Sequence, residues 1–263
     1  MNCKNCSNNL RAKQKFCDEC GAKIIQNRLK PKVLAQQVNE HYFSIDNKLL
    51  LTFLDLFRKP EVVIVGYING TRKKYIDVLQ YFALSLTLTG IQVFLMSTFF
   101  KESTDISSQF INGFNDASTT TDNPFKDFDV NALNNYQGLI YILTVPFSAV
   151  GSWLAYYIIG ERTYNFTEHL VINLYYSAQI IIITALLTIL FLVFGLDYLL
   201  ISSIVYILTF VYLFYILKRI FKTNFWNTLG RFSLVMAIYI GSFLIIGLIT
   251  MLIVVIIAVA LHK

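Results

Sequence analysis

The chain has 263 residues, of which 56% are hydrophobic, 15% are aromatic and only 14% are charged. This composition excludes an intrinsically disordered protein, a secreted disulfide scaffold and a water-soluble enzyme with a conventional polar surface. It predicts an all-α integral membrane protein. The net charge of +6 is segregated: residues 1–76 carry 14 Lys and Arg against 6 Asp and Glu, whereas residues 101–137 carry 2 against 6.

All four cysteines lie in the first twenty residues, as two Cys-x-x-Cys pairs: Cys3 with Cys6, and Cys17 with Cys20. This spacing is typical of a tetrahedral Zn²⁺ site, because each pair supplies two thiolates on a tight turn. We expect a structural zinc ribbon over residues 1–24, whose folding free energy comes mostly from the metal. Iron in the same cage, a redox dithiol pair and two disulfides are the alternatives.

The surroundings of the cysteines suit a small ribbon. Phe16 is expected to cover the metal, and Gly21 is expected to relieve the second turn. Residues 1–32 carry eight Lys and Arg against Asp18 and Glu19. Such an excess can indicate nucleic-acid binding, but we favour an attraction to an anionic membrane surface and a ribbon that docks a protein partner.

Residues 25–76 are expected to be a linker with amphipathic helices. Residues 33–42 and 50–57 show apolar side chains at helical spacing, Pro60 closes the second stretch, and the apolar run 62–68 follows. These stretches are too short and too charged at their ends to cross a membrane. We therefore expect them to lie in the membrane interface, with the apolar face down.

Residues 77–263 are expected to form the transmembrane domain. Five uncharged stretches each supply the roughly 20 apolar residues that a helix needs to cross the hydrocarbon core. The segment 101–137 should form a long outer loop, and the short turn at 195–197 should make spans three and four an antiparallel hairpin. The predicted spans are residues 78–100, 138–160, 171–194, 198–217 and 235–259.

Orientation follows from the Lys and Arg residues of the short loops, which collect on the cytoplasmic side. Ten of them lie on the side of the N-terminus and three on the other side. We therefore expect the N-terminus in the cytoplasm and the C-terminus outside, in a multi-pass protein of the cytoplasmic membrane.

Seven of these cations are candidates for binding anionic lipid headgroups. Phe221, Phe225 and Trp226 lie among four of them, and aromatic side chains prefer the headgroup level. A purely orientational role is the alternative. The seven are Arg72, Lys73, Lys74, Lys218, Arg219, Lys222 and Arg231.

Small residues in the second span predict a close helix contact. Ser148, Gly151, Ser152 and Ala155 fall at positions i, i+3, i+4 and i+7, so they share one helix face. A pore lining is the alternative for this face.

A second candidate site lies at the cytoplasmic ends of spans two and three, where Glu161, Glu168, His169 and Asn173 cluster. A carboxylate beside a histidine can serve acid–base chemistry or bind a metal. A membrane-embedded lipid-modifying enzyme or a facilitative transporter is therefore one functional hypothesis. The structural interpretation is a helix start, with Asn165 as N-cap and Glu168 completing a capping box.

The membrane stretches themselves disfavour ion-coupled transport, because none of the five carries a charged residue or a histidine at mid-depth. We favour a non-enzymatic adaptor or regulator that docks a cytoplasmic or membrane partner.

The order of the motifs is similar to that of a known family. The two cysteine pairs are followed by Tyr67-Ile68-Asn69-Gly70-Thr71-Arg72-Lys73-Lys74-Tyr75-Ile76 before the first span, and Glu168-His169-Leu170-Val171 opens the third. This order resembles the domain-of-unknown-function 3667 family of bacterial membrane proteins. The resemblance implies a polytopic zinc-ribbon protein of the bacterial inner membrane, with no established activity. Tyr175 and Tyr176 stand where that family often has histidines, so no histidine-rich metal site is carried over.

Overall fold

The computed structural model describes residues 2–11, 14–22, 24, 48–100, 136–196 and 198–261, and side chains as far as residue 244 except that of residue 199. It divides the chain into two compact units, residues 1–47 and 48–263. This division differs from the expected domain limits at residues 24 and 76. Residues 48–76 belong to the same unit as the membrane helices.

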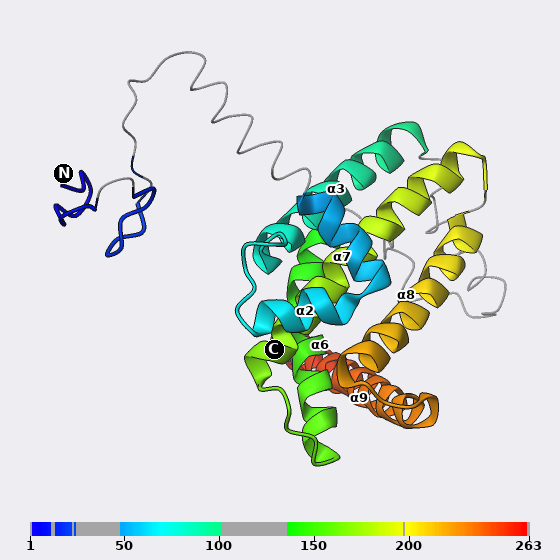
Figure 1. Cartoon of the computed structure of the whole chain (residues 1–263). Coiled ribbons are helices and arrows are strands. Elements are labelled where there is room, and N and C mark those ends of the chain that lie inside the picture. The colour runs from blue at the N-terminus through cyan, green and yellow to red at the C-terminus, as the bar shows by residue number, and fades with distance from the viewer. Residues whose placement is uncertain are drawn as a thin grey trace, which may run out of the picture. The chain divides into compact units, whose positions relative to one another are not determined.

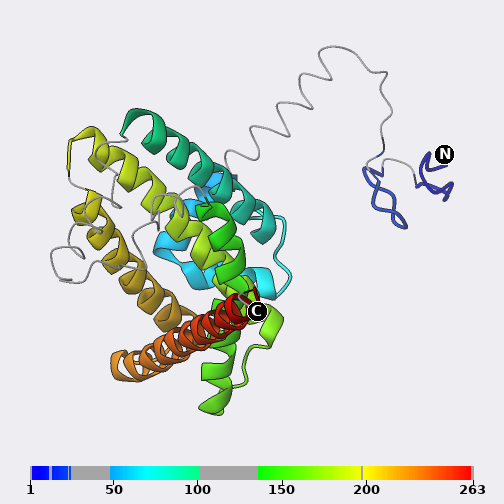
Figure 2. The ribbon, with the colours of Figure 1, turned by 180° about the vertical axis from the view of Figure 1, so that it is seen from behind.

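The secondary-structure elements in the described part of the second unit are all helices (Figure 1). A helix at residues 48–58 comes first. The helices that follow are α2 (Pro60–Ile68), α3 (Val78–Phe99), α6 (Gln137–Ile158), α7 (Phe166–Val193), α8 (Tyr198–Phe221) and α9 (Phe225–Leu261). Helices α3 and α7 lie side by side, and α9 crosses the lower end of the bundle against α6 (Figures 1 and 2).

Four of these helices, α3, α6, α7 and α8, are long and apolar enough to cross a membrane. They confirm the all-α membrane architecture and match the first four predicted spans closely. The fifth predicted span, 235–259, lies within α9, mostly beyond the described side chains, so the count of five stays a prediction. The residues at 33–42 and nearly all of the predicted outer loop 101–137 lie outside the described residues.

The ends of α7 follow directly from the local sequence. The Asn165 side chain accepts the Glu168 N–H at 3.0 Å, and the Glu168 carboxylate accepts the Asn165 N–H at 2.7 Å, which confirms the predicted capping box. At the other end Gly195 has φ +73°, and its N–H donates to the Leu192 carbonyl at 2.9 Å. This left-handed turn favours glycine and allows α8 to return against α7, as the predicted hairpin requires.

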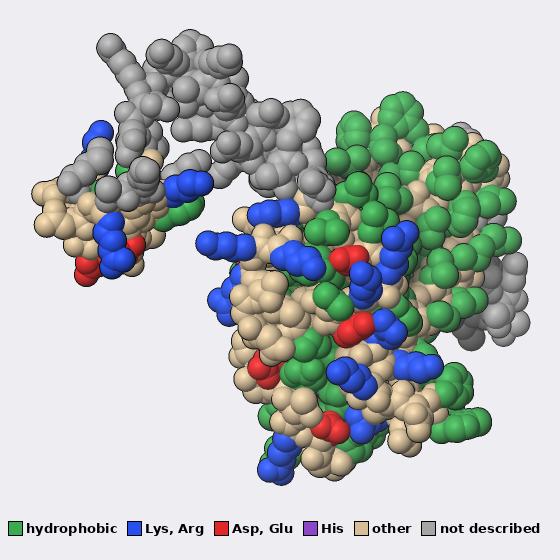
Figure 3. All heavy atoms as spheres, in the orientation of Figure 1, with side chains coloured by type: hydrophobic (Ala, Val, Ile, Leu, Met, Phe, Trp, Pro, Cys, Tyr) green, Lys and Arg blue, Asp and Glu red, His purple; other side chains and the backbone are tan. Residues whose placement is uncertain are grey.

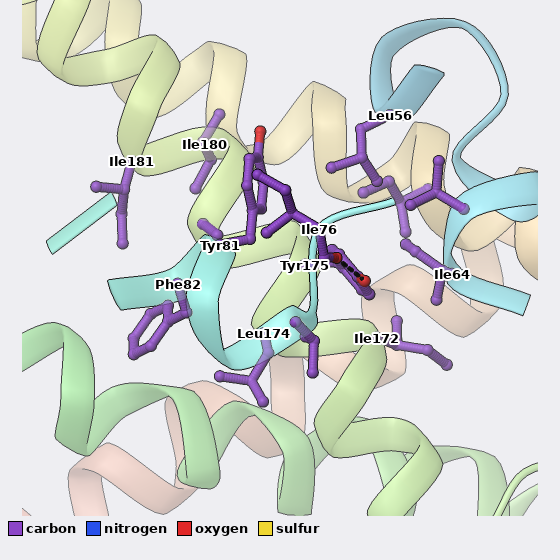
Figure 4. Packing of buried hydrophobic residues seen from close by; sticks show 14 of the residues in the cluster. Leu56, Ile64, Ile76, Tyr81, Phe82, Ile172, Leu174, Tyr175, Ile180 and Ile181 are labelled. Atoms are coloured by element: carbon purple, nitrogen blue, oxygen red, sulfur yellow. Dashed lines mark hydrogen bonds between the residues drawn. The ribbon is translucent and has the colours of Figure 1, made fainter. Parts of the chain in front are cut away.

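The helix at 48–58 and α2 pack into the bundle. Leu56, Val63 and Ile64 are each 0% exposed. They enter the same core as Tyr81 of α3 and Tyr175 of α7 (Figure 4). The inward face of this helical hairpin therefore contacts protein, and only its outward side chains can face lipid.

Polar side chains of the membrane helices also hold this hairpin by its backbone. The Tyr212 hydroxyl of α8 donates to the Leu56 carbonyl at 3.2 Å, and the Gln179 amide of α7 donates to the Phe53 carbonyl at 3.2 Å. Gln179 in turn accepts a hydrogen bond from Tyr81. The last carbonyls of a helix lack hydrogen-bond donors within the helix. Tyr212 supplies a donor to the Leu56 carbonyl, which lipid could not do. This explains why residues 48–76 join the second unit.

The small-residue face of α6 is a helix contact, as predicted. An added Cβ at Gly151 would lie 3.9 Å from the backbone N and Cα of Tyr239 in α9. We expect Gly151→Ala to be tolerated, because 3.9 Å is an ordinary van der Waals distance. Gly151→Leu should lower the free energy of unfolding by about 1–3 kcal/mol, because its longer side chain must push α9 away. Thermal unfolding of both variants in the same detergent checks this, and equal midpoints would contradict the contact.

Candidate functional site

The four cysteines converge at one point of the first unit. Their Sγ atoms all lie within 4.8 Å of one another. The Cys3 and Cys20 sulfurs are 3.6 Å apart and the Cys6 and Cys17 sulfurs 3.5 Å apart, and none of the four is in a disulfide. Sulfurs about 3.8 Å apart are what a tetrahedral ion with metal–sulfur bonds near 2.3 Å requires. The donor set therefore fits a metal.

The two Cys-x-x-Cys turns, which we call knuckles, have the same backbone geometry. This geometry brings the two sulfurs of each pair to the same side of the turn. The Cys3 N–H donates to Asn8 and the Cys17 N–H donates to Ala22, at 2.8 and 2.9 Å. In each knuckle the residue after the second cysteine has positive φ, +61° at Ser7 and +68° at Gly21. Gly21 was expected in this role, but Ser7 was not. Its position, four residues after the first cysteine of its knuckle like Gly21, is the signal that could have identified it.

The electrostatics of the cluster also favour a cation. N–H groups of Cys6 and Asn5 lower the pKa of Cys3, and the side chain of Asn5 followed by the Ala22 N–H lowers the pKa of Cys20 to about 6. For Cys6, the Asn8 N–H is the largest single cause and lowers the pKa, but the Cys20 sulfur, burial and the Cys17 and Cys3 sulfurs together outweigh it and raise the pKa to about 12. Four thiolates this close repel one another, so full ionisation needs a positive ion among them.

Phe16 does not cover the sulfur cluster, contrary to expectation. Its side chain is 56% exposed. Cys3 and Cys17 are buried, whereas Cys6 and Cys20 are exposed. The knuckle turns themselves shield the first cysteine of each pair, so no aromatic cover is needed and Phe16 remains on the surface.

The second predicted cluster separates into distinct contacts. His169 and Asn173 are 2% and 5% exposed. The Ser152 hydroxyl lies 3.1 Å from Nδ1 of His169, and the Asn173 amide donates to that same hydroxyl at 2.9 Å. Asn173 also accepts from Ser148 at 3.0 Å. This buried hydrogen-bonded network joins α6 to α7.

The two carboxylates of that cluster have other partners. Glu168 completes the capping box at the start of α7. Glu161 forms an ion pair with Arg231 of α9 at 3.3 Å, and the Arg231 guanidinium lies 5.5 Å from the ring centre of Tyr156. Of the four predicted residues, the structure therefore brings together His169 and Asn173. Glu168 instead caps α7, and Glu161 pairs with Arg231.

The seven candidate headgroup cations differ in their surroundings. Arg219 forms a bidentate pair with Glu61 of α2, at 3.0 and 2.6 Å. The Arg72 guanidinium and the Lys74 ammonium lie over the rings of Tyr67 and Tyr75, at 5.4 and 5.0 Å. Arg231 pairs with Glu161, and the remaining three, Lys73, Lys218 and Lys222, are exposed. The ion pairs of Arg219 with Glu61 and of Arg231 with Glu161 were not predicted, although both acids lie on the predicted cytoplasmic side, as do the arginines.

Comparison with known proteins found a match for residues 46–90, the segment that includes the helix at 48–58 and α2. Residues 46–90 match the model of a family described as "Protein of unknown function (DUF3667)". No curated protein and no solved structure matches the chain. The matched residues supply the helix at 48–58, α2 and the first part of α3. Over this segment the chain is similar to this family of unknown function, which confirms the resemblance that the order of the motifs indicated.

Proposed function

We propose that the protein is a membrane-anchored adaptor or regulator whose N-terminal ribbon docks a protein partner. The observation that carries the proposal is the four-thiol cluster, which fits a closed tetrahedral site. Zn²⁺ in such a site has no open coordination position, so it folds the ribbon and catalyses nothing. Zinc is the metal we assign, because it is redox-inert and suits four thiolates in a cytoplasmic setting.

The exposed surface of the ribbon supports a docking role. Phe16 stands 56% exposed directly before Cys17. A large apolar side chain held beside a rigid metal knuckle is a ready contact for another protein, since aromatic residues are enriched where proteins bind one another. We therefore expect the partner to be a protein with an apolar contact surface. We do not assign nucleic acid as the ligand.

The alternative function, a lipid-modifying enzyme or facilitative transporter, receives less support. A general acid or base must reach a substrate proton. Glu168 is held by Asn165, Glu161 by Arg231, and His169 by Ser152. These residues stabilise helix ends and helix contacts, which is sufficient to account for them.

The proposed setting is the bacterial cytoplasmic membrane, with the N-terminus in the cytoplasm and the C-terminus outside. The excess of cations in the short loops on the N-terminal side supports this orientation. The ribbon would then meet cytoplasmic partners, while the helices contact lipid.

Partner capture tests the adaptor function. The full chain, a variant lacking residues 2–24, and Phe16→Ala would each be crosslinked in cells and purified. We expect one protein to be enriched with the full chain and lost with both variants, while Phe16→Ala still carries its metal. Lys4→Gln, on the other knuckle, serves as the control and should keep the partner. An identical set of crosslinked proteins with and without the ribbon would contradict docking.

A further inference from the structure

Two basic segments far apart in the sequence meet at one end of the second unit. Arg58 and Lys59 form the bend between the helix at 48–58 and α2. Lys218 lies in the last turn of α8, and Lys222 lies directly after its end. The Tyr215 hydroxyl of α8 joins the segments, because its one proton is shared between the Phe57 and Arg58 carbonyl oxygens, which lie 3.0 and 3.2 Å from the hydroxyl oxygen.

An ion pair fixes the same junction. Arg219 holds both oxygens of Glu61, one residue beyond Pro60. The pair neutralises its own charges and sets α2 against the end of α8. Four exposed cations remain beside it: Arg58, Lys59, Lys218 and Lys222. We call these four residues the elbow cluster.

The elbow cluster continues an apolar face of α8. Ile207 and Val211 are 62% and 60% exposed, and with Lys218 they fall at i, i+4 and i+11, which is one face of the helix. Trp226, at the start of α9, is 77% exposed, and tryptophan prefers the headgroup level of a membrane. Figure 3 shows Lys and Arg gathered over this end of the unit, with hydrophobic side chains covering the upper part.

We propose that the elbow cluster binds the phosphate of an anionic phospholipid whose acyl chains lie along Ile207 and Val211. The apolar stripe matches the chains, and the cations at its end match the headgroup. Arg72, Lys73 and Lys74 are not part of this site. They follow the far end of α2, and Glu61 at its near end contacts α8. Nine helical residues, about 13 Å, separate the two ends.

Lipid retention by two triple variants tests the proposal. Lys59→Gln/Lys218→Gln/Lys222→Gln removes three elbow cations, and Arg72→Gln/Lys73→Gln/Lys74→Gln removes three from the other segment. Each full-length protein would be purified from vesicles of phosphatidylglycerol and phosphatidylcholine, and its bound lipids counted by native mass spectrometry. We expect the elbow variant to retain roughly tenfold less phosphatidylglycerol and the other variant to change less than twofold. Equal losses, or no loss, would overturn the site.

A charge-neutral variant tests whether the two segments act together. Tyr215→Phe keeps every cation but removes the hydroxyl that joins the segments, so retention should fall several-fold. Tyr206→Phe, an exposed tyrosine of the same helix, should leave retention unchanged. If Tyr215→Phe retains as much lipid as the parent, the composite site is wrong. Displacement of the lipid by excess inorganic phosphate would likewise overturn a lipid ligand.

Orientation is checked in the same proteins. A reporter that is active only outside the cytoplasm, fused at residue 224, is expected to be silent in the parent and in Tyr215→Phe. Activity in the parent would place the elbow cluster on the outer face and overturn its assignment to the cytoplasmic leaflet.

Discussion

Cys17→Ser is expected to release the metal and unfold the ribbon while the helical unit stays folded. Cys3 and Cys17 are the only buried side chains among the described residues of the ribbon, so we expect binding free energy of roughly 10 kcal/mol or more from a structural Zn²⁺ to be its main source of stability. The membrane helices form a separate compact unit. Metal analysis should find about one ion per chain in the parent and almost none in the variant. Amide exchange should accelerate over residues 2–24 and stay unchanged over α7.

Ser7→Gly is the matched control for this experiment. Ser7 has φ +61° and bears no ligand atom. Glycine adopts this conformation at no steric cost, so the variant should keep its metal and exchange no faster than the parent. Full metal content in a Cys17→Ser/Cys20→Ser double variant would contradict the site. The identity of the bound element separates zinc from iron.

Leu56→Ala is expected to destabilise the helical unit by about 2–5 kcal/mol, because it leaves a cavity in a well-packed core. Leu56 is 0% exposed and packs with the cluster that includes Ile64 and Tyr175. Thermal unfolding in detergent, followed through the tryptophan fluorescence, measures the loss.

Leu50→Ala removes the same side chain from the outward face of the same helix, where Leu50 is 56% exposed. Its effect should stay within about 0.5 kcal/mol, as for most surface substitutions. Equal effects of the two variants would indicate a helix that lies on lipid, as its sequence pattern alone suggests, and would contradict its packing against α7 and α8.

Local features of this chain could be predicted because each depends on neighbouring residues. The spacing of the cysteines sets the knuckle turns, Asn165 and Glu168 set the start of α7, and Gly195 ends it. Apolar runs of about 20 residues define membrane helices without reference to the rest of the fold. The family segment carried its own motif, the run from Tyr67 to Ile76.

The pairing of elements was decided by the tertiary structure. An amphipathic helix has the same sequence pattern whether its apolar face meets lipid or protein, so burial of Leu56 could not be read from periodicity. The Glu61–Arg219 pair joins residues 158 positions apart, and nothing in the sequence near either residue identifies its partner. The sequence alone thus determined the first four membrane helices and the four residues that can bind a metal. Tertiary packing decided which acid each arginine pairs with and which carbonyl each tyrosine hydroxyl contacts, because those contacts depend on how the helices lie against one another.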